Sequence, residues 1–248
     1  MPLRYYRKKS RGTMDCSVSI AMATFNGEKH VINQLESLAR QTLMPVELIV
    51  TDDGSEDKTV DFILGFAYQL KFPVQVVRND VRLGYGRNFL KAASLSKSKY
   101  VAFCDQDDIW HPEKIALVNE VASRYEYDLV VHGGNVVDAS LIELGESFPD
   151  VDEGVIELGR YSKMFFPGYA MTVKRDFLEK LNYELLIDVE DKSFEHDLWI
   201  CSSILQGGSC YGINKPLVSY RQHDSNVIGF SALMNSERHA TIERRVVV

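Results

Sequence analysis

The stretch that decides the fold prediction is YVAFCDQDDIW, residues 100–110. Its first five residues are apolar or aromatic and have the length of a buried strand. The acidic run Asp105-Gln106-Asp107-Asp108 follows them directly. The same order, an apolar run that ends in polar residues, occurs upstream at residues 17–23 and 46–51. Ligands of open α/β sheets bind beyond the carboxyl ends of the strands, so we expect a binding site at this edge.

Strand-like runs alternate with helical patterns on both sides of this stretch. Apolar residues at helical spacing predict helices at residues 28–40, 56–70, 87–96 and 112–125. Ser55 is the expected N-cap of the second helix, and Pro112 opens the fourth. Strands are predicted at residues 17–23, 46–51, 74–77, 100–104 and 129–132. This order predicts an α/β fold with a mostly parallel central sheet and helices on both faces.

The pattern becomes less regular after residue 138. We predict a strand at residues 166–173, helices at 175–181 and 197–205, and a strand at 217–221. No internal repeat, low-complexity tract or linker separates this part from the rest. A single domain with an irregular C-terminal third is therefore the expected organisation.

Composition limits the classes of protein to consider. The chain has 248 residues, with 28 Lys and Arg against 35 Asp and Glu, so its formal net charge is −7. Hydrophobic residues make up 45% and charged residues 25%, which is typical of a soluble globular protein. The acidic balance argues against a nucleic-acid partner, which requires a basic face. The four cysteines form no CxxC pair, which favours reduced thiols over a zinc site or disulfide framework.

Residues 1–15 form a basic N-terminal tail with Lys or Arg at positions 4, 7, 8, 9 and 11. No apolar stretch follows them, so they do not read as a secretory signal. No part of the chain approaches the roughly 18 apolar residues of a membrane span. We expect a cytoplasmic protein, and two interpretations of the tail stay open. It contacts anionic lipid at the inner face of the cell membrane, or it is a solvated segment.

Acidic residues follow two of the predicted strands. Asp52 and Asp53 end the strand at residues 46–51, and Asp105, Asp107 and Asp108 end the strand at residues 100–104. Clustered carboxylates repel one another unless a cation lies between them. Mg²⁺ or Mn²⁺ can bridge such carboxylates to substrate phosphates. The alternative is that these aspartates are turn and cap residues, for which Asp is also common.

The usual phosphate-binding motifs are missing. There is no GxxxxGK[ST] loop, and Gly84-Tyr85-Gly86 lacks the third glycine of a dinucleotide motif. Arg87 nevertheless opens a predicted helix, whose N-terminus favours an anion. A surface ion pair is the alternative for Arg87. Further along, Asp197 is an acid near a predicted helix start, for which a capping residue is the alternative to a functional one, and His223 follows the last predicted strand as a ligand or a structural histidine.

Six short stretches occur in a fixed order: ATFNGE at residues 23–28, DDGS at 52–55, DQDDIW at 105–110, PGYA at 167–170, HDLW at 196–199 and YRQH at 220–223. Together they resemble the family 2 glycosyltransferases with the GT-A fold, a Rossmann-like α/β domain. The resemblance is to the bacterial rhamnosyltransferase-like branch of cell-surface polysaccharide synthesis. It covers residues 17 to about 229. It implies a GT-A domain at 16–229, with a nucleotide-binding half at 16–138 and an acceptor-binding half at 139–229, between tails at 1–15 and 230–248.

The resemblance implies donor-binding roles for residues after the first two strands. Thr24, Asn26 and Glu28 would line the nucleotide pocket. Asp53 would approach the base, with Asp52 as its close neighbour. Arg87, Asp105 and Gln106 belong to the same expected donor site, with Asp105 nearer the ribose.

The resemblance also implies a divalent cation, Mn²⁺ or Mg²⁺, as cofactor. Asp107 would bind the cation as part of a DxD motif. Asp108 would not bind the cation itself but would hold another of its ligands or a water molecule in place. His223 matches a C-terminal histidine that in some members reaches the metal or the diphosphate.

Asp197 matches the aspartate that acts as catalytic base in this family. The residue before it departs from the family's usual acidic pair, because here it is His196, as in the rhamnosyltransferase-like branch. His196, Trp199 and Trp110 are the expected acceptor-binding residues. The alternatives are that His196 orients Asp197 and that the two tryptophans are packed in the interior, their more usual environment. The QxxRW motif of processive synthases is absent, which favours the addition of a single sugar.

The implied reaction is an inverting transfer of one sugar from a nucleoside diphosphate sugar to a hydroxyl of a glycan or lipid-linked acceptor. The resemblance favours dTDP-rhamnose as donor, with UDP-hexoses as the alternatives. Three other functions are the alternatives: a catalytically degenerate nucleotide-sugar binding module, a sugar-nucleotidylyltransferase and an aspartyl phosphatase. The glycine- and arginine-rich loop of the second is missing after the first strand. Ile109 stands where the third requires threonine.

Overall fold

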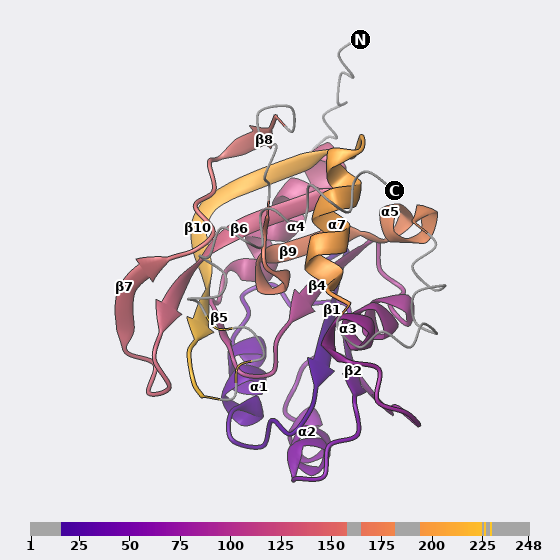
Figure 1. Cartoon of the computed structure of the whole chain (residues 1–248), viewed down its shortest axis with the longest axis vertical. Coiled ribbons are helices and arrows are strands. Elements are labelled where there is room, and N and C mark those ends of the chain that lie inside the picture. Colours follow the sequence, from indigo (N-terminus) through magenta and orange to yellow (C-terminus); the bar gives the residue numbers. More distant parts are fainter. Residues whose placement is uncertain (1–15, 158–164, 182–193, 225, 227–228, 230–248) are drawn as a thin grey trace.

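The computed structural model describes residues 16–157, 165–181, 194–224, 226 and 229. Within these residues, ten strands form one continuous sheet in the order β3-β2-β1-β4-β9-β6-β10-β5, with β7 beside β6 and β8 beside β10. Both expected halves of the domain contribute strands to this sheet (Figure 1). The expected tails at residues 1–15 and 230–248 lie outside the described residues.

The first four predicted strands form the parallel part of the sheet. They are β1 (Val18–Thr24), β2 (Leu48–Asp52), β3 (Val74–Arg78) and β4 (Tyr100–Cys104). Ile20 on β1 lies opposite Leu48 on one side and Ala102 on the other, and all three are fully buried. Burial on both faces explains why β1, β2 and β4 read as apolar runs, whereas β3 is an edge strand whose residues are all at least partly exposed.

Helices cover both faces of the sheet, as predicted. α1 (Val31–Ala39), α2 (Thr59–Ala67) and α4 (Lys114–Tyr125) pack into one apolar cluster. α3 (Tyr85–Ser94), α5 (Arg175–Lys180) and α7 (His196–Leu205) pack into the other. The expected α/β class with a central sheet is confirmed.

The second half of the sheet is mixed rather than parallel. β9 (Met171–Lys174) runs antiparallel between β4 and β6 (Leu129–Val137), so β6 does not pair with β4. Only residues 171–173 of the predicted strand at 166–173 belong to β9, together with Lys174, because Gly168–Ala170 is a short 3-10 turn, η2, that follows Pro167.

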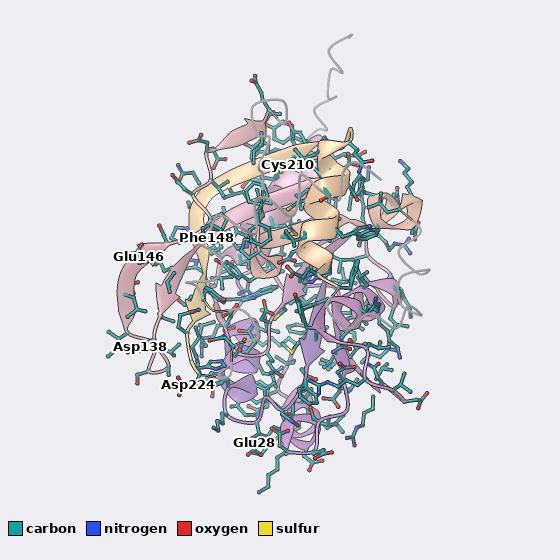
Figure 2. All side chains as sticks on the ribbon, viewed as in Figure 1. Glu28, Asp138, Glu146, Phe148, Cys210 and Asp224 are labelled. Carbon is teal, nitrogen blue, oxygen red and sulfur yellow. The ribbon has the colours of Figure 1, made fainter. Side chains whose placement is uncertain are left out.

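β10 (Cys210–Arg221) is longer than the predicted strand at residues 217–221. It runs parallel to β6 with register shifts around Pro216. Three short strands were not predicted: β5 (Ile109–Trp110), β7 (Glu143–Ser147) and β8 (Gly154–Ile156). β7 pairs with the end of β6 and forms an outlying margin of the molecule (Figure 1), where Asp138 and Glu146 lie (Figure 2).

The expected cap at Ser55 is wrong. α2 begins at Thr59 with Lys58 as its N-cap, three residues later than predicted. The Ser55 hydroxyl instead donates to Oδ2 of Asp52 at 2.5 Å. The four cysteines, all in the described part of the chain, are free thiols. No helix among the described residues is long and apolar enough to cross a bilayer.

Candidate functional site

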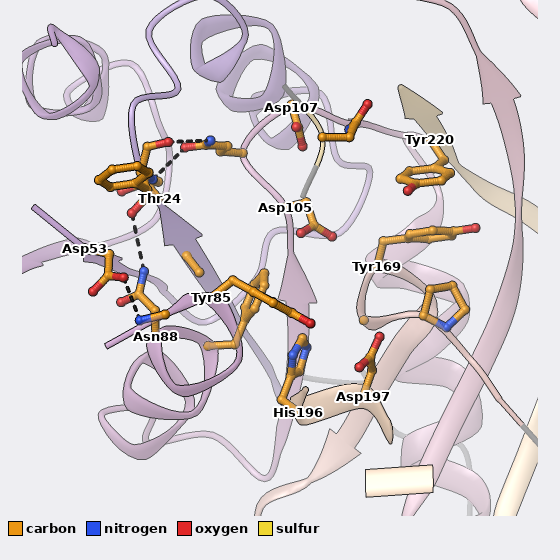
Figure 3. A pocket seen from close by; sticks show the side chains of 18 of the residues that line it. Thr24, Asp53, Tyr85, Asn88, Asp105, Asp107, Tyr169, His196, Asp197 and Tyr220 are labelled. Atoms are coloured by element: carbon orange, nitrogen blue, oxygen red, sulfur yellow. Dashed lines mark hydrogen bonds between the residues drawn. The ribbon is translucent and has the colours of Figure 1, made fainter. Parts of the chain in front are cut away.

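A cavity of about 600 Å³ opens at the carboxyl ends of the parallel strands. Its wall is built from the ends of β1 and β10, the acidic segment that follows β4, the starts of α3 and α7, and the turn η2. Figure 3 shows Asp105, Tyr169, His196 and Asp197 gathered around one space. Seven predicted site residues line the cavity: Thr24, Asp53, Asp105, Gln106, Asp107, His196 and Asp197.

Asp53 anchors the loop that leads into α3. Its Oδ1 accepts hydrogen bonds from the backbone N–H of Leu83 at 2.7 Å and from the amide of Asn79 at 3.0 Å. Its Oδ2 accepts from the backbone N–H of Gly84 at 2.9 Å. Both carboxylate oxygens therefore bind the loop, and Asp53 shapes the wall of the cavity whether or not it contacts a base.

Asp52, Asn26 and Glu28 order the turns after β1 and β2 and do not line the cavity. Oδ2 of Asp52 accepts from the Thr24 hydroxyl at 2.9 Å. Oδ1 of Asn26 accepts from the backbone N–H of Glu56 at 2.9 Å, and Oε2 of Glu28 accepts from that of Lys58 at 3.1 Å. The three side chains tie the two turns together beneath the site. Direct donor contact by them stays a prediction.

Gln106 fixes the residue that follows Thr24. Its side-chain amide accepts from the backbone N–H of Phe25 and donates to the Phe25 carbonyl, both at 3.0 Å. The guanidinium of Arg82 lies 3.8 Å from the centroid of the Phe25 ring. Phe25 and Arg82 both line the cavity, so this corner combines an aromatic face with a positive charge.

Three carboxylates follow β4: Asp105 and Asp107 line the floor of the cavity, and Asp108 is fully buried next to them. Burial raises the pKa of Asp105 to about 7, and the neighbouring charges of Asp107 and Asp197 act in the same direction. Burial also raises the pKa of Asp108 well above its usual range, against a hydrogen bond from the backbone N–H of Arg221 at 3.0 Å. These acids are costly to hold as anions unless a cation compensates them.

His223 lies against this acidic floor. Its Nε2 is 2.8 Å from Oδ2 of Asp107. The His223 ring stacks on His30 with centroids 4.5 Å apart, and Nη1 of Arg221 lies 2.6 Å from Nδ1 of His30. The structure thus brings together the two predicted metal ligands, Asp107 and His223, from residues 116 positions apart in the chain.

These residues fit a hard divalent cation that takes part of its coordination from other molecules. Among the described residues no group of three or more His, Cys, Asp or Glu side chains is arranged to hold a metal. Mg²⁺ in particular is commonly bound through one or two protein carboxylates, water and substrate phosphates. A site with Asp107 and His223 as its protein ligands matches that chemistry. The charge of a cation bound there would also compensate the negative charge of the neighbouring Asp105 carboxylate.

Asp197 and His196 form the opposite wall, at the first turn of α7. Asp197 is 5% exposed, and its Oδ1 accepts from the backbone N–H of Leu198 at 2.9 Å. The His196 ring is stacked on Phe89 with centroids 4.5 Å apart and meets Phe103 edge-on. Burial lowers the pKa of His196 to about 3, so the ring is neutral near pH 7.

α7 reaches this position because α3 has a glycine at the contact. A Cβ atom on Gly86 would collide with the carbonyl of Phe194 and lie 3.1 Å from the backbone nitrogen of His196. The two glycines at residues 84 and 86 therefore have different structural reasons. Gly84 has a φ of +84° and donates its N–H to Asp53, while Gly86 lets the two helices approach.

The sequence did not single out several residues of the cavity wall. Tyr169 and Tyr220 stack with centroids 4.7 Å apart (Figure 3), and Tyr85 meets His196 edge-on at 6.5 Å. Asn88 donates to the backbone carbonyl of Thr51 at 2.8 Å and lines the cavity. The motifs PGYA and YRQH contain two of these tyrosines, but only the fold places them side by side.

Besides His223 and the three turn residues described above, three more predicted site residues do not line the cavity. Arg87 is 2% exposed, and its guanidinium lies 5.4 Å from the centroid of Phe194. Trp110 is 1% exposed and has the ammonium of Lys114 over its ring. Trp199 packs near Phe194, with ring centroids 6.1 Å apart. Donor contact by Arg87 and acceptor contact by the tryptophans stay predictions.

The sequence of this chain matches the model of a known protein family. The sequence model of glycosyl transferase family 2 matches residues 19–181. The dTDP-rhamnosyl transferase RfbG of Shigella flexneri is 26% identical over 227 residues, which cover 84% of this chain and 73% of RfbG. An uncharacterized glycosyltransferase of Methanocaldococcus jannaschii is 28% identical over 191 residues, which cover 74% of this chain and 63% of that protein.

Solved structures of similar shape agree with the fold. Crystal structures of residues 1–349 of TarS from S. aureus superpose with TM-scores of 0.70 for the complex with UDP and 0.72 for that with UDP-GlcNAc. Sequence identity is 20% and 18%, and the matches cover 93% of this chain. They cover 64% and 65% of the TarS chains, so this chain spans just under two thirds of their length. The expected GT-A fold is confirmed.

Proposed function

Because this chain belongs to glycosyl transferase family 2, we propose that it is a glycosyltransferase that moves one sugar from a nucleoside diphosphate sugar to an acceptor hydroxyl. The observation that carries the proposal is one cavity with an acidic floor on one side and Asp197 on the other. Asp107 with His223 would bind the diphosphate end of the donor through a cation. Asp197 would meet the acceptor across the space between them.

The donor is a nucleoside diphosphate sugar, with dTDP-rhamnose as the first choice and UDP-hexoses as the second. RfbG, a dTDP-rhamnosyl transferase, is the relative that favours the first. The TarS complexes with UDP and UDP-GlcNAc favour the second. The acceptor we propose is a glycan or a lipid-linked glycan of cell-surface polysaccharide synthesis, at the cytoplasmic face of the membrane.

The diphosphate needs positive charge as the bond to the sugar breaks. Asp107 and His223 would hold Mn²⁺ or Mg²⁺, which when bound supplies a Lewis acid for the leaving diphosphate. At another corner of the cavity, the Phe25 ring offers a stacking face for the base of the nucleotide, and the guanidinium of Arg82 offers a positive charge. Asp53 keeps the loop of Arg82 in place through three hydrogen bonds.

The acceptor hydroxyl needs a base because it is a poor nucleophile. Asp197 would take its proton while the oxygen attacks the anomeric carbon on the face opposite the diphosphate, which inverts the configuration. General-base assistance of this kind contributes roughly 10²–10⁴-fold to the rate. The neutral ring of His196 packs beside Asp197 and adds no charge that would lower the basicity of this carboxylate. Tyr169 and Tyr220 offer stacked aromatic faces for a sugar ring.

The experiment follows release of nucleoside diphosphate from dTDP-rhamnose, UDP-glucose and UDP-GlcNAc in the presence of Mn²⁺. Asp197→Asn should lower turnover at least about 100-fold while donor binding is retained, as expected for loss of a general base. Asp176→Asn is the matched control, because Asp176 also lies in the first turn of a helix but is exposed. Near-normal turnover by Asp197→Asn would contradict the assignment of the base.

The same assay separates the proposal from its alternatives. A degenerate binding module would bind the nucleotides in calorimetry but release no diphosphate from any donor. A sugar-nucleotidylyltransferase would release pyrophosphate from a nucleoside triphosphate and a sugar phosphate. Neither outcome is compatible with the proposed transfer.

A further inference from the structure

His30 is a histidine beside the proposed cation site to which neither the sequence nor the proposed reaction gives a role. It lies in the turn between β1 and α1, as the residue that precedes the helix. Its side chain makes no capping hydrogen bond to α1. The start of the helix therefore does not explain why a histidine stands here. Its contacts are instead with residues from the end of β10.

Arg221 fixes the orientation of the His30 ring. Nη1 of Arg221, the last residue of β10, lies 2.6 Å from Nδ1 of His30, although the two residues are 191 positions apart in the chain. A guanidinium can only donate hydrogen bonds, so Nδ1 of His30 is the acceptor and its Nε2 carries the hydrogen. Nη2 of Arg221 donates to Oδ1 of Asn33 at 3.4 Å. The same arginine thus contacts both the turn and the first turn of α1.

The His30 ring lies against His223. The two imidazole rings are stacked, with centroids 4.5 Å apart and planes inclined by 24°. Nε2 of His223 lies 2.8 Å from Oδ2 of Asp107. The backbone N–H of His223 donates to Oδ1 of Asn226 at 2.6 Å, and the Asn226 amide donates to the carbonyl of Arg221 at 3.1 Å. Asn226 therefore holds the backbone of His223, while His30 supports the plane of its ring.

Residues that contact the ligands of a metal orient those ligands, and their loss commonly lowers the affinity for the metal roughly 10–100-fold. We propose that His30 is a positioning residue of the cation site: fixed by Arg221, its ring is the platform that keeps Nε2 of His223 directed at Asp107. This proposal rests on the part of the proposed function that assigns the cation to Asp107 and His223. It adds a residue from the turn after β1, which does not line the cavity.

Calorimetry of UDP and of dTDP, in Mn²⁺ and in EDTA, tests the proposal without turnover. His30→Ala should bind the nucleotide in Mn²⁺ about 10-fold more weakly than the wild type, because the ring of His223 is no longer held. His30→Phe restores a flat ring beneath His223, so it should bind more tightly than His30→Ala. In EDTA all three proteins should bind alike, which a general disturbance of the pocket would not allow. His111→Ala, which removes an exposed imidazole outside the cavity wall, is the control.

Nitrogen NMR of protein labelled in its histidine side chains tests the platform directly, in the absence of any metal. The wild type should show His30 with the hydrogen on Nε2 and none on Nδ1, as the contact with Arg221 requires. His30→Ala should shift the ring signals of His223 and leave those of His132, which is buried on β6, unchanged. The first of these measurements uses the wild type, so it does not depend on the folding of a variant.

The proposal is overturned if His30→Ala binds nucleotide in Mn²⁺ as tightly as the wild type, or if His30→Phe binds no better than His30→Ala. It is also overturned if His30→Ala binds more weakly in EDTA, or if His30 carries its hydrogen on Nδ1. Each of these results leaves the proposed function intact, provided that Mn²⁺ strengthens nucleotide binding by the wild type. A wild type without that gain contradicts the cation site itself, and the role of His30 with it.

Discussion

A Cβ atom on Gly168 would lie 2.7 Å from Nε2 of His196. Real Cβ atoms do not approach other atoms so closely, so one of the two groups would have to move. The His196 ring has little room to do so, because Phe89 stacks on one face and Phe103 meets it edge-on. The turn η2 and the start of α7 are therefore fitted to each other at the wall that carries Asp197.

Gly168→Ala should disturb this wall. The added methyl group displaces His196 or the turn, and overpacking of this kind typically costs about 1–3 kcal/mol. We expect a lower Tm and a larger loss of turnover than of nucleotide affinity, since the displaced residues adjoin Asp197 rather than the floor. Gly65→Ala is the matched control, because Gly65 lies in α2 with nothing within 4 Å of a Cβ. A Gly168→Ala protein with wild-type Tm and turnover would show that the wall adapts freely.

The buried neutral ring of His196 predicts a pH dependence of stability. Its pKa is about 3 in the folded protein against an ordinary value of 6.5. Between these values the unfolded chain binds the proton and the folded protein does not, so stability falls as pH falls below 6.5. From pH 7 to pH 5, His196 should cost the wild type about 2 kcal/mol.

His196→Gln isolates that contribution, because glutamine does not titrate. Chemical denaturation of both proteins at pH 7 and pH 5 gives the difference of the two pH effects. The wild type should lose about 2 kcal/mol more than the variant over this range. An equal loss in both proteins would mean that another group carries the pH dependence.

The parallel half of the fold could be predicted because its signals are local. Strands buried on both faces, such as Tyr100–Cys104, show as unbroken apolar runs. The mixed half depends on partners that are distant in the chain. Lys215 and Pro216 interrupt the apolar run of β10, yet the strand continues because β6 pairs with it through register shifts. The exposed strand Glu143–Ser147 has no apolar period at all.

The candidate site likewise has residues that could be predicted from the sequence and residues that could not. The acidic run after β4 and the His196-Asp197 pair could be found in the sequence, because each combines a polar group with an element boundary. The aromatic wall could not, since Tyr85, Tyr169 and Tyr220 meet only through the tertiary fold. Asp53 shows a further limit of prediction from the sequence. Its position was predicted, but the hydrogen bonds to Leu83 and Gly84 that occupy its oxygens come from a loop 30 residues away.

Asp53→Ala should release the loop at residues 79–84. The variant loses the acceptors of two backbone N–H groups and of the Asn79 amide, each of them a bond to a charged group worth about 1.5–3 kcal/mol. Trypsin should then cleave after Arg82 at least about 10-fold faster than in the wild type. Asp80→Ala, which removes an exposed acid from the same loop, is the control. Equal cleavage of all three proteins would mean that other contacts hold the loop.

The acidic floor predicts that tight binding of a nucleoside diphosphate depends on a divalent cation. Asp107→Ala removes one of the two proposed ligands, and His223→Ala removes the other, 2.8 Å away. Both variants should bind UDP or dTDP more weakly than the wild type when Mn²⁺ is present, and the three proteins should bind alike in EDTA. Calorimetry with and without Mn²⁺ measures this, and Asp150→Ala, an exposed acid outside the cavity, is the control. If Asp107→Ala keeps the full Mn²⁺-dependent gain in affinity, the cation is held elsewhere, and Asp107 and His223 serve only to fasten the segment after β10 to the floor.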